Sequence, residues 1–242
     1  MRRILVWDLP VRVFHWVFAA CLLSALGIAL LAEEESSIFS LHMLAGLSAA
    51  FMLILRVIIS TIGGAHSRLS DLFFRPGETV DYLVGALKGS SQRYPGHNPG
   101  TALVAIGMFL LVLLLVWTGL SRSTESMEEV HPVLAYLLLG LVGAHLIGLL
   151  LHTIHHRENI WLSMLTGTKE GPEGAGLAHA HVPAGVATVL LTAGWFIGLW
   201  SSFDSASSRL HLPFTGQTIT LGESESDKGT HAGEEQEGEE ND

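Results

Sequence analysis

Cysteine and charge are both scarce in this sequence. Cys21 is the only cysteine among 242 residues, which excludes an intramolecular disulfide and any Cys-x-x-Cys motif. Charged residues make up 15% of the chain and hydrophobic residues 49%. With a mean hydropathy of +0.43, the chain is too apolar for a water-soluble protein of this length. The composition therefore predicts an integral membrane protein.

Long runs without charge give the number of membrane spans. Each run is close to the ~20 residues that an α-helix needs to cross the bilayer core. None alternates like a barrel strand, and backbone groups in lipid must pair internally, so helices are the remaining choice. Although Arg2 and Arg3 precede the first run, it is longer than a signal-peptide core, and we expect it to stay in the mature chain. The sequence predicts an all-α fold with five membrane helices, over residues 11–31, 38–60, 102–120, 130–152 and 183–200.

The loops between these runs predict how the chain crosses the membrane. Basic residues concentrate in one set of loops and acidic residues in the other, and the basic side of a membrane protein is normally cytoplasmic. This bias places the N-terminus in the cytoplasm and the C-terminus outside. The residues on the predicted inner side are Arg2, Arg3, Arg12, Arg56, Arg68, Arg75, Lys88, Arg93, Arg157 and Lys169.

Two segments outside the spans have a distinct composition. Residues 201–242 are rich in Gly, Ser, Glu and Asp, and we expect this acidic tail to be disordered, because it cannot bury enough apolar surface to fold. Within the loop 61–101, residues 71–87 have the pattern of an amphipathic helix. This helix is expected to lie at the inner membrane interface.

Four histidines occupy matching depths in the predicted helices. Counted from the outer ends at ~1.5 Å per residue, His15 lies about 24 Å deep and His145 about 22 Å deep. His42 and His131 both lie within about 6 Å of the outer boundary. His131 and His145 are also spaced by close to four helical turns, which puts them on one face of the same helix. The histidines therefore form an inner pair, His15 with His145, and an outer pair, His42 with His131.

These pairs predict two haem sites. A single histidine in an apolar helix is more often a hydrogen-bonded core residue, but paired polar residues inside a membrane mark a site, and imidazole is a good axial ligand of haem iron. A zinc site is disfavoured, because no cysteine or carboxylate accompanies the pairs at that depth. Without a Cys-x-x-Cys-His motif, both haems must be non-covalent b-type groups. His152 shares a face with His145 and is the reserve ligand.

Three further residues are predicted to contact the cofactors. Arg56 falls in the inner layer, where it either pairs with the propionates of the inner haem or extends to the cytoplasmic surface. Arg12 has the same two interpretations. His97 precedes the third span and is expected either to hydrogen-bond a propionate or to cap the helix.

Five segments share features with one known family: Val6-Trp7-Asp8-Leu9-Pro10-Val11-Arg12-Val13-Phe14-His15-Trp16, Leu41-His42-Met43-Leu44-Ala45-Gly46, Arg93-Tyr94-Pro95-Gly96-His97-Asn98-Pro99, Glu128-Glu129-Val130-His131 and His155-His156-Arg157-Glu158-Asn159. Together they resemble the bacterial cytochrome b561 family, which includes the b-type cytochrome subunits of nickel-iron hydrogenases. The resemblance covers about residues 4–168. At Pro132 the family has an acidic residue, so a carboxylate near the haem is missing and a residue suited to the first helical turn takes its place.

The resemblance implies a four-helix di-haem cytochrome b core in the bacterial inner membrane, with ligands at His15, His42, His131 and His145. Such cytochromes exchange electrons with the quinone pool and with a periplasmic partner, for example a c-type cytochrome or a hydrogenase. The remaining segments are not part of the family core, so their roles are not implied. The predicted units are the core at 1–168, a cytoplasmic loop at 169–182, the fifth helix at 183–200 and a periplasmic tail at 201–242.

The function expected from the sequence is electron transfer across the membrane through two b haems, between quinol or quinone and a periplasmic redox protein. Whether the chain is itself a quinol-linked oxidoreductase stays open. One alternative is a haem-carrying membrane anchor for a hydrogenase or another periplasmic oxidoreductase. Another is a transporter that uses its histidines for protons or a metal, which the lack of broken helices and of acidic residues within the spans disfavours. No nucleic-acid partner is expected.

Overall fold

The computed structural model of the chain describes residues 2–33, 36, 38–90, 92–121, 125–204, 207, 209–212 and 216–221. Five helices in this part are long and apolar enough to cross a membrane, which confirms the predicted number of spans. α5 is longer than expected at both ends, so Pro132 lies inside it and not in its first turn. The five helices are α1 (Leu9–Leu31), α2 (Phe39–Ile62), α4 (Pro99–Leu120), α5 (Glu125–His156) and α7 (Val182–Ser202).

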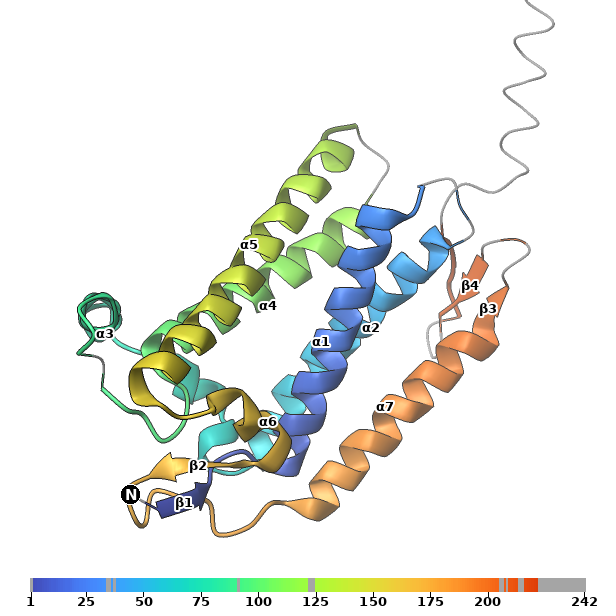
Figure 1. Cartoon of the computed structure of the whole chain (residues 1–242). Helices are drawn as coiled ribbons and strands as arrows, with labels where there is room; N and C mark the ends of the chain where they lie inside the picture. Colours follow the sequence, from blue (N-terminus) through green and yellow to red (C-terminus); the bar gives the residue numbers. More distant parts are fainter. Residues whose placement is uncertain are drawn as a thin grey trace, which may run out of the picture.

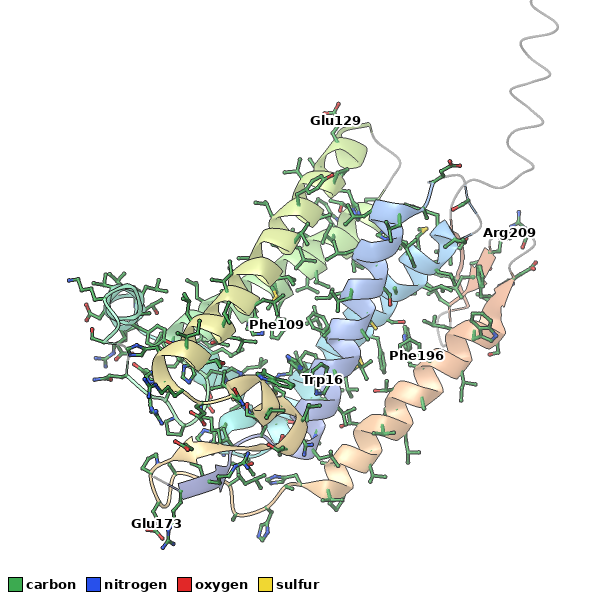
Figure 2. All side chains as sticks on the ribbon, viewed as in Figure 1. Trp16, Phe109, Glu129, Glu173, Phe196 and Arg209 are labelled. Carbon is green, nitrogen blue, oxygen red and sulfur yellow. The ribbon has the colours of Figure 1, made fainter. Side chains whose placement is uncertain are left out.

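The five helices form two packed pairs and one flanking helix. α1 packs along α2, α4 packs along α5, and α2 joins the pairs by contacting α4, while α7 packs against α1 and α2 (Figure 1). We call the end of the bundle where α1 begins the proximal end, and the end where α1 stops and α2 begins the distal end. Figure 2 shows Glu129 and Arg209 at the distal end and Glu173 at the proximal end.

Capping residues begin two of the helices. Asp8 caps α1, with its side chain accepting a hydrogen bond from the amide of Val11 at 3.3 Å, and Asn98 caps α4 by accepting from Thr101 at 2.8 Å. In both helices a proline follows in the first turn, where its missing N–H costs no hydrogen bond. Asp8 also accepts from the amide of Gly64 at 2.7 Å, which ties the start of α1 to the chain after α2.

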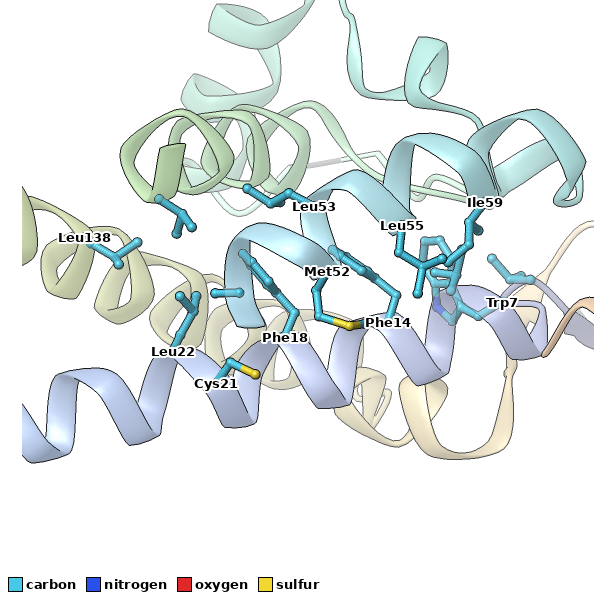
Figure 3. Packing of buried hydrophobic residues seen from close by; sticks show 14 residues of the cluster. Trp7, Phe14, Phe18, Cys21, Leu22, Met52, Leu53, Leu55, Ile59 and Leu138 are labelled. Carbon is cyan, nitrogen blue, oxygen red and sulfur yellow. The ribbon is translucent and has the colours of Figure 1, made fainter. Parts of the chain in front are cut away.

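The buried core runs along the contact between α1 and α2. Phe14, Phe18 and Leu22 of α1 pack with Met52 and Leu53 of α2 (Figure 3). The outer faces of α5 and α7 instead expose many large apolar side chains, which suits contact with lipid.

Short elements cover the proximal end. The amphipathic helix predicted at 71–87 is α3 (Pro76–Leu87), and the chain before it forms the 3-10 turns η1 (Ala65–Ser67) and η2 (Leu69–Leu72). After α5 come η3 (Ile160–Leu162) and α6 (Ser163–Thr166). β1 (Arg2–Leu5) then pairs antiparallel with β2 (Thr168–Gly171), so the boundary predicted between 168 and 169 falls inside a strand.

A small sheet lies at the distal end. β3 (Phe203–Asp204), β4 (Arg209–His211) and β5 (Thr218–Thr220) form an antiparallel sheet in the order β3-β4-β5. The expectation of a disordered tail is wrong for these strands, because Leu210 and Leu221 are buried and pack with Leu44 and Leu199. Residues 222–242, which hold most of the acidic tail, lie outside the described residues.

Candidate functional site

A cavity of about 500 Å³ opens between the two helix pairs at the distal end. Residues of α1, α2, α4, α5 and β5 line it, and nearly all of them are apolar. Its size falls within the range of ~300–1,000 Å³ typical of sites for small molecules and cofactors. Several lining residues are small, which leaves room for a flat group between the helices: Ala25, Ala29, Gly46, Ala49, Gly119 and Ala135.

His42 and His131 are the two histidines of this cavity. His42 lies in the first turns of α2 and His131 in the distal part of α5, so α2 and α5 bring the rings together from two sides. The ring centroids are 6.1 Å apart and the ring planes are inclined by 72°. The structure thus brings together the two residues that the sequence predicted as the outer pair.

Each of these histidines has its Nδ1 atom in a hydrogen bond with a neighbouring helix. Nδ1 of His42 donates to the carbonyl oxygen of Ala25 on α1 at 2.8 Å. Nδ1 of His131 lies 2.9 Å from the hydroxyl oxygen of Thr118 on α4. Metal-binding histidines usually donate their second ring nitrogen in this way, which orients the ring and determines its tautomer.

The spacing of the distal pair would allow both rings to hold one metal ion between them. A metal–imidazole bond is about 2 Å long and the nitrogen lies roughly 1 Å from its ring centre, so two rings on opposite sides of a metal need centroids about 6 Å apart. The 6.1 Å found here agrees with that requirement. Bis-histidine ligation in an apolar cavity is typical of b-type haem, whose flat macrocycle the small lining residues would accommodate.

His15 and His145 lie deeper toward the proximal end. The two imidazoles are close enough to interact electrostatically. Nδ1 of His15 is buried and has no hydrogen-bond partner among the described residues. A buried polar atom without a partner is unusual and fits a site for a group that the chain alone does not supply.

A buried polar cluster lies beside His15 and consists of Arg56, His97 and Lys169. Arg56 is 3% exposed and donates to the carbonyl oxygen of Ser67 at 2.6 Å, while Nζ of Lys169 donates to the carbonyl oxygen of Gly96 at 3.2 Å. Nδ1 of His97 is buried without a hydrogen-bond partner in the described part of the chain. Asp8 and Asp71 already interact with Arg56, and Glu158 with Lys169, so the unsatisfied ring nitrogen of His97 beside these cations is what favours a further anionic group here.

Burial lowers the pKa values of two residues in this cluster, His97 and Lys169. Burial, followed by the charge of Arg56 and then that of Lys169, lowers the pKa of His97 to about 3. Burial also lowers the pKa of Lys169 to about 8, although Glu158 acts in the opposite direction. His97 is therefore neutral and Lys169 mostly charged near neutral pH. Lys169 was predicted only as one of several basic residues on the inner side, since nothing in its local sequence indicates a buried site.

Two of the sequence interpretations are corrected at this cluster. Arg56 does not extend to the surface, because its side chain is buried and lies with its charged carbon 5.7 Å from the ring centre of Phe14. His97 does not cap α4, because Asn98 has that role, and the ring of His97 instead meets Trp7 edge-on at 4.7 Å. For Arg56 and His97, the interpretation that remains is a contact with a haem propionate.

Arg12 lies apart from this cluster. Its guanidinium donates to the backbone carbonyl oxygens of Met164, at 3.3 Å, and of Leu165. These bonds tie α1 to α6. The predicted propionate contact of Arg12 stays a prediction.

His152, the reserve ligand, belongs to a polar group at the end of α5. Its ring lies 4.4 Å from that of His156, and its Nε2 atom is 3.9 Å from Glu158. Arg93 joins this group by donating to the carbonyl oxygen of His156 at 3.0 Å and by pairing with Glu170 at 3.2 Å. No group of three or more His, Cys, Asp or Glu side chains in the described residues is arranged to hold a metal ion.

Comparison with known families agrees with this geometry. The sequence model of the family described as prokaryotic cytochrome b561 matches residues 6–167, which include α1 to α6 and end before β2. No curated protein and no solved structure matches the chain. The chain belongs to the prokaryotic cytochrome b561 family, and with it come b-type haem binding and transmembrane electron transfer.

Proposed function

We propose that this member of the prokaryotic cytochrome b561 family transfers electrons across the bacterial inner membrane through two b haems. His42 and His131 hold the distal haem, and His15 and His145 hold the proximal one. The observation that carries the proposal is the 6.1 Å separation of the His42 and His131 rings in an apolar cavity of about 500 Å³. When bound, the haem irons supply the one-electron redox chemistry.

The chain's own residues prepare the distal ligands. The carbonyl of Ala25 and the hydroxyl of Thr118 hold the Nδ1 atoms, so that Nε2 is the ring nitrogen offered to the metal. The walls of the cavity are mostly apolar, which lowers the local polarity around this pair. Low polarity and fixed rings are two of the factors that set the potential of a bis-histidine haem.

Arg56, His97 and Lys169 hold the propionates of the proximal haem. Their burial beside His15 supports this role, since a carboxylate there would supply the missing hydrogen-bond partner of His97. Lys169 lies just beyond the family match, on a strand that pairs with the N-terminal β1.

The proposed orientation places the proximal end in the cytoplasm. Basic residues gather at that end, including Arg2, Arg93 and Lys169, in agreement with the rule that cytoplasmic loops are basic. The distal haem then faces the periplasm and exchanges electrons with a periplasmic redox protein, while quinol or quinone is the membrane-soluble partner. Reduction of a basic c-type cytochrome that slows as salt increases would support electrostatic docking at the distal face.

The haem content of the purified chain tests the proposal. A pyridine haemochrome assay should find two non-covalent haems per chain, and the reduced protein should show b-type absorption. His42→Ala or His131→Ala should lose the distal haem only, and His15→Ala or His145→Ala the proximal haem only. His179→Ala, at an exposed loop position, is the matched control and should keep both. One haem per chain, or none, would overturn the proposal.

A further inference from the structure

We propose that the C-terminal β3–β5 sheet, held in place by α7, forms a wall that shields the distal haem from solvent and raises its reduction potential. This inference rests on the proposed function, because it concerns the group held by His42 and His131. The segment lies beyond the family match, which ends at residue 167. The wall is therefore an addition to the four-helix core.

The last described strand reaches the cavity itself. Ile219 of β5 and Leu221, which directly follows β5, line the same cavity as His42 and His131. The hydroxyl of Ser40 donates to the carbonyl oxygen of Leu221 at 3.0 Å, and this bond is buried. Since Ser40 precedes His42 by two residues in the first turn of α2, the bond attaches the sheet to the turn that carries a proposed ligand.

An apolar contact holds the sheet in place. Leu210 and Leu221 are completely or almost completely buried and pack with Leu44 of α2 and Leu199 of α7. Figure 1 shows β3 and β4 beside the distal ends of α2 and α7. Leu44 follows His42 by two residues, so the sheet contacts α2 on both sides of that histidine along the chain.

α7 anchors the wall farther along α2. The ring of Trp195 stacks on that of Phe51 with centroids 4.3 Å apart, and its Nε1 atom donates to the hydroxyl of Ser48 at 3.3 Å. These contacts make α7 and the sheet one continuous layer on α2. The layer covers the distal cavity where β5 meets α2.

Excluding water at this place has a predictable effect on the cofactor. The iron–porphyrin core carries one positive charge when oxidised and none when reduced, and burial disfavours the charged form. Lower solvent exposure therefore raises the reduction potential. The wall should also hold the start of α2 rigid, which keeps the His42 ring in its orientation.

Neutral substitutions in the full-length chain test the wall. Ile219→Asn places a polar side chain at the cavity, whereas Thr218→Asn places the same side chain on the exposed face of the same strand. Redox titration should show a more negative midpoint potential for the distal haem in Ile219→Asn and no shift in Thr218→Asn. The distal haem is identified as the one lost in His42→Ala.

A second variant gives a measurement that does not depend on the cofactor. Ser40→Ala removes the bond to Leu221, so hydrogen–deuterium exchange in the first turn of α2 should become faster, whereas Ser60→Ala near the other end of α2 should leave that turn unchanged. If both variants still bind two haems, and Ile219→Asn keeps its potential and Ser40→Ala its exchange rate, the role of the wall is refuted while the proposed function stands. Absence of a distal haem from the unaltered chain would overturn the proposed function and this inference with it.

Discussion

Nδ1 of His131 on α5 lies 2.9 Å from the hydroxyl oxygen of Thr118 on α4. The same oxygen is 3.0 Å from the carbonyl oxygen of Leu114 and 3.1 Å from that of Leu115. A hydroxyl has one hydrogen, so when it donates to one of these carbonyls its oxygen accepts from Nδ1–H of His131. This arrangement keeps the lone pair on Nε2, which is the tautomer that binds a metal through Nε2.

Removing this hydroxyl should weaken the distal haem site. Thr118→Val keeps the shape of the buried side chain but leaves Nδ1 of His131 without this acceptor. Loss of a hydrogen bond to a metal-binding histidine typically lowers metal affinity by about 10- to 100-fold, and we expect a loss of that order in haem affinity. Haem transfer to an excess of an apo-acceptor protein measures it as faster release of the distal haem.

The conservative variant separates the hydrogen bond from packing. Thr118→Ser keeps the hydroxyl and should release the distal haem at nearly the rate of the unaltered chain. If Thr118→Val also releases haem at that rate, the hydroxyl does not position His131.

Filling the distal cavity should remove its haem without unfolding the chain. Gly46 of α2 lines the cavity, and an added Cβ there meets no atom within 4 Å. Gly46→Leu should favour the helix by up to about 1 kcal/mol while its side chain occupies the space of the cofactor. We expect thermal stability of the haem-free chain to be kept or raised, and the haem content to fall from two per chain to one.

Gly148→Leu is the matched control for that prediction. Gly148 lies on α5, is exposed, and also has open space around an added Cβ. Its haem content should stay at two. Retention of two haems in Gly46→Leu would show that the cavity is not the cofactor site.

The histidine pairing follows from helix geometry, which is why the sequence predicts it. Five apolar runs give five helices, and a rise of ~1.5 Å per residue is enough to match His42 with His131 in depth. Pairing by depth does not depend on how the helices pack sideways. The same reasoning matches His15 with His145, and that pairing stays a prediction.

Residues that support the ligands could not be predicted in this way. Thr118 and the carbonyl of Ala25 act through contacts between helices, which depend on how each helix is rotated about its axis. Lys169 reaches the proximal cluster because β2 pairs with β1, a long-range contact with no local signal. The distal sheet had a weak signal, since Leu210 and Leu212 alternate with polar residues, but the acidic composition around it favoured disorder.

The pH dependence of stability should include a contribution from His97. Its pKa in the folded chain is about 3, below the value of 6.5 for the unfolded chain, so only the unfolded chain takes up this proton as the pH falls from about 6.5 toward 3. The contribution of His97 to stability is complete above pH 6.5 and decreases through that range. His97→Gln should therefore lose less stability than the unaltered chain between pH 7 and pH 4.5, measured as Tm of the two haem-free chains in detergent. An equal decrease in both proteins would contradict the neutral, buried state of this ring.

Removing the charge of Lys169 should lower the potential of the proximal haem. Lys169 is 7% exposed, and its pKa is lowered to about 8. Because this value is still above 7, the side chain is mostly charged at pH 7. A partly screened positive charge disfavours the oxidised haem by on the order of 1 kcal/mol, which corresponds to some tens of millivolts for one electron. Lys169→Met should show a shift of that size to more negative potential at pH 7, whereas Lys88→Met, at an exposed position after α3, should show none. Equal potentials at pH 7 would exclude Lys169 from the proximal haem site.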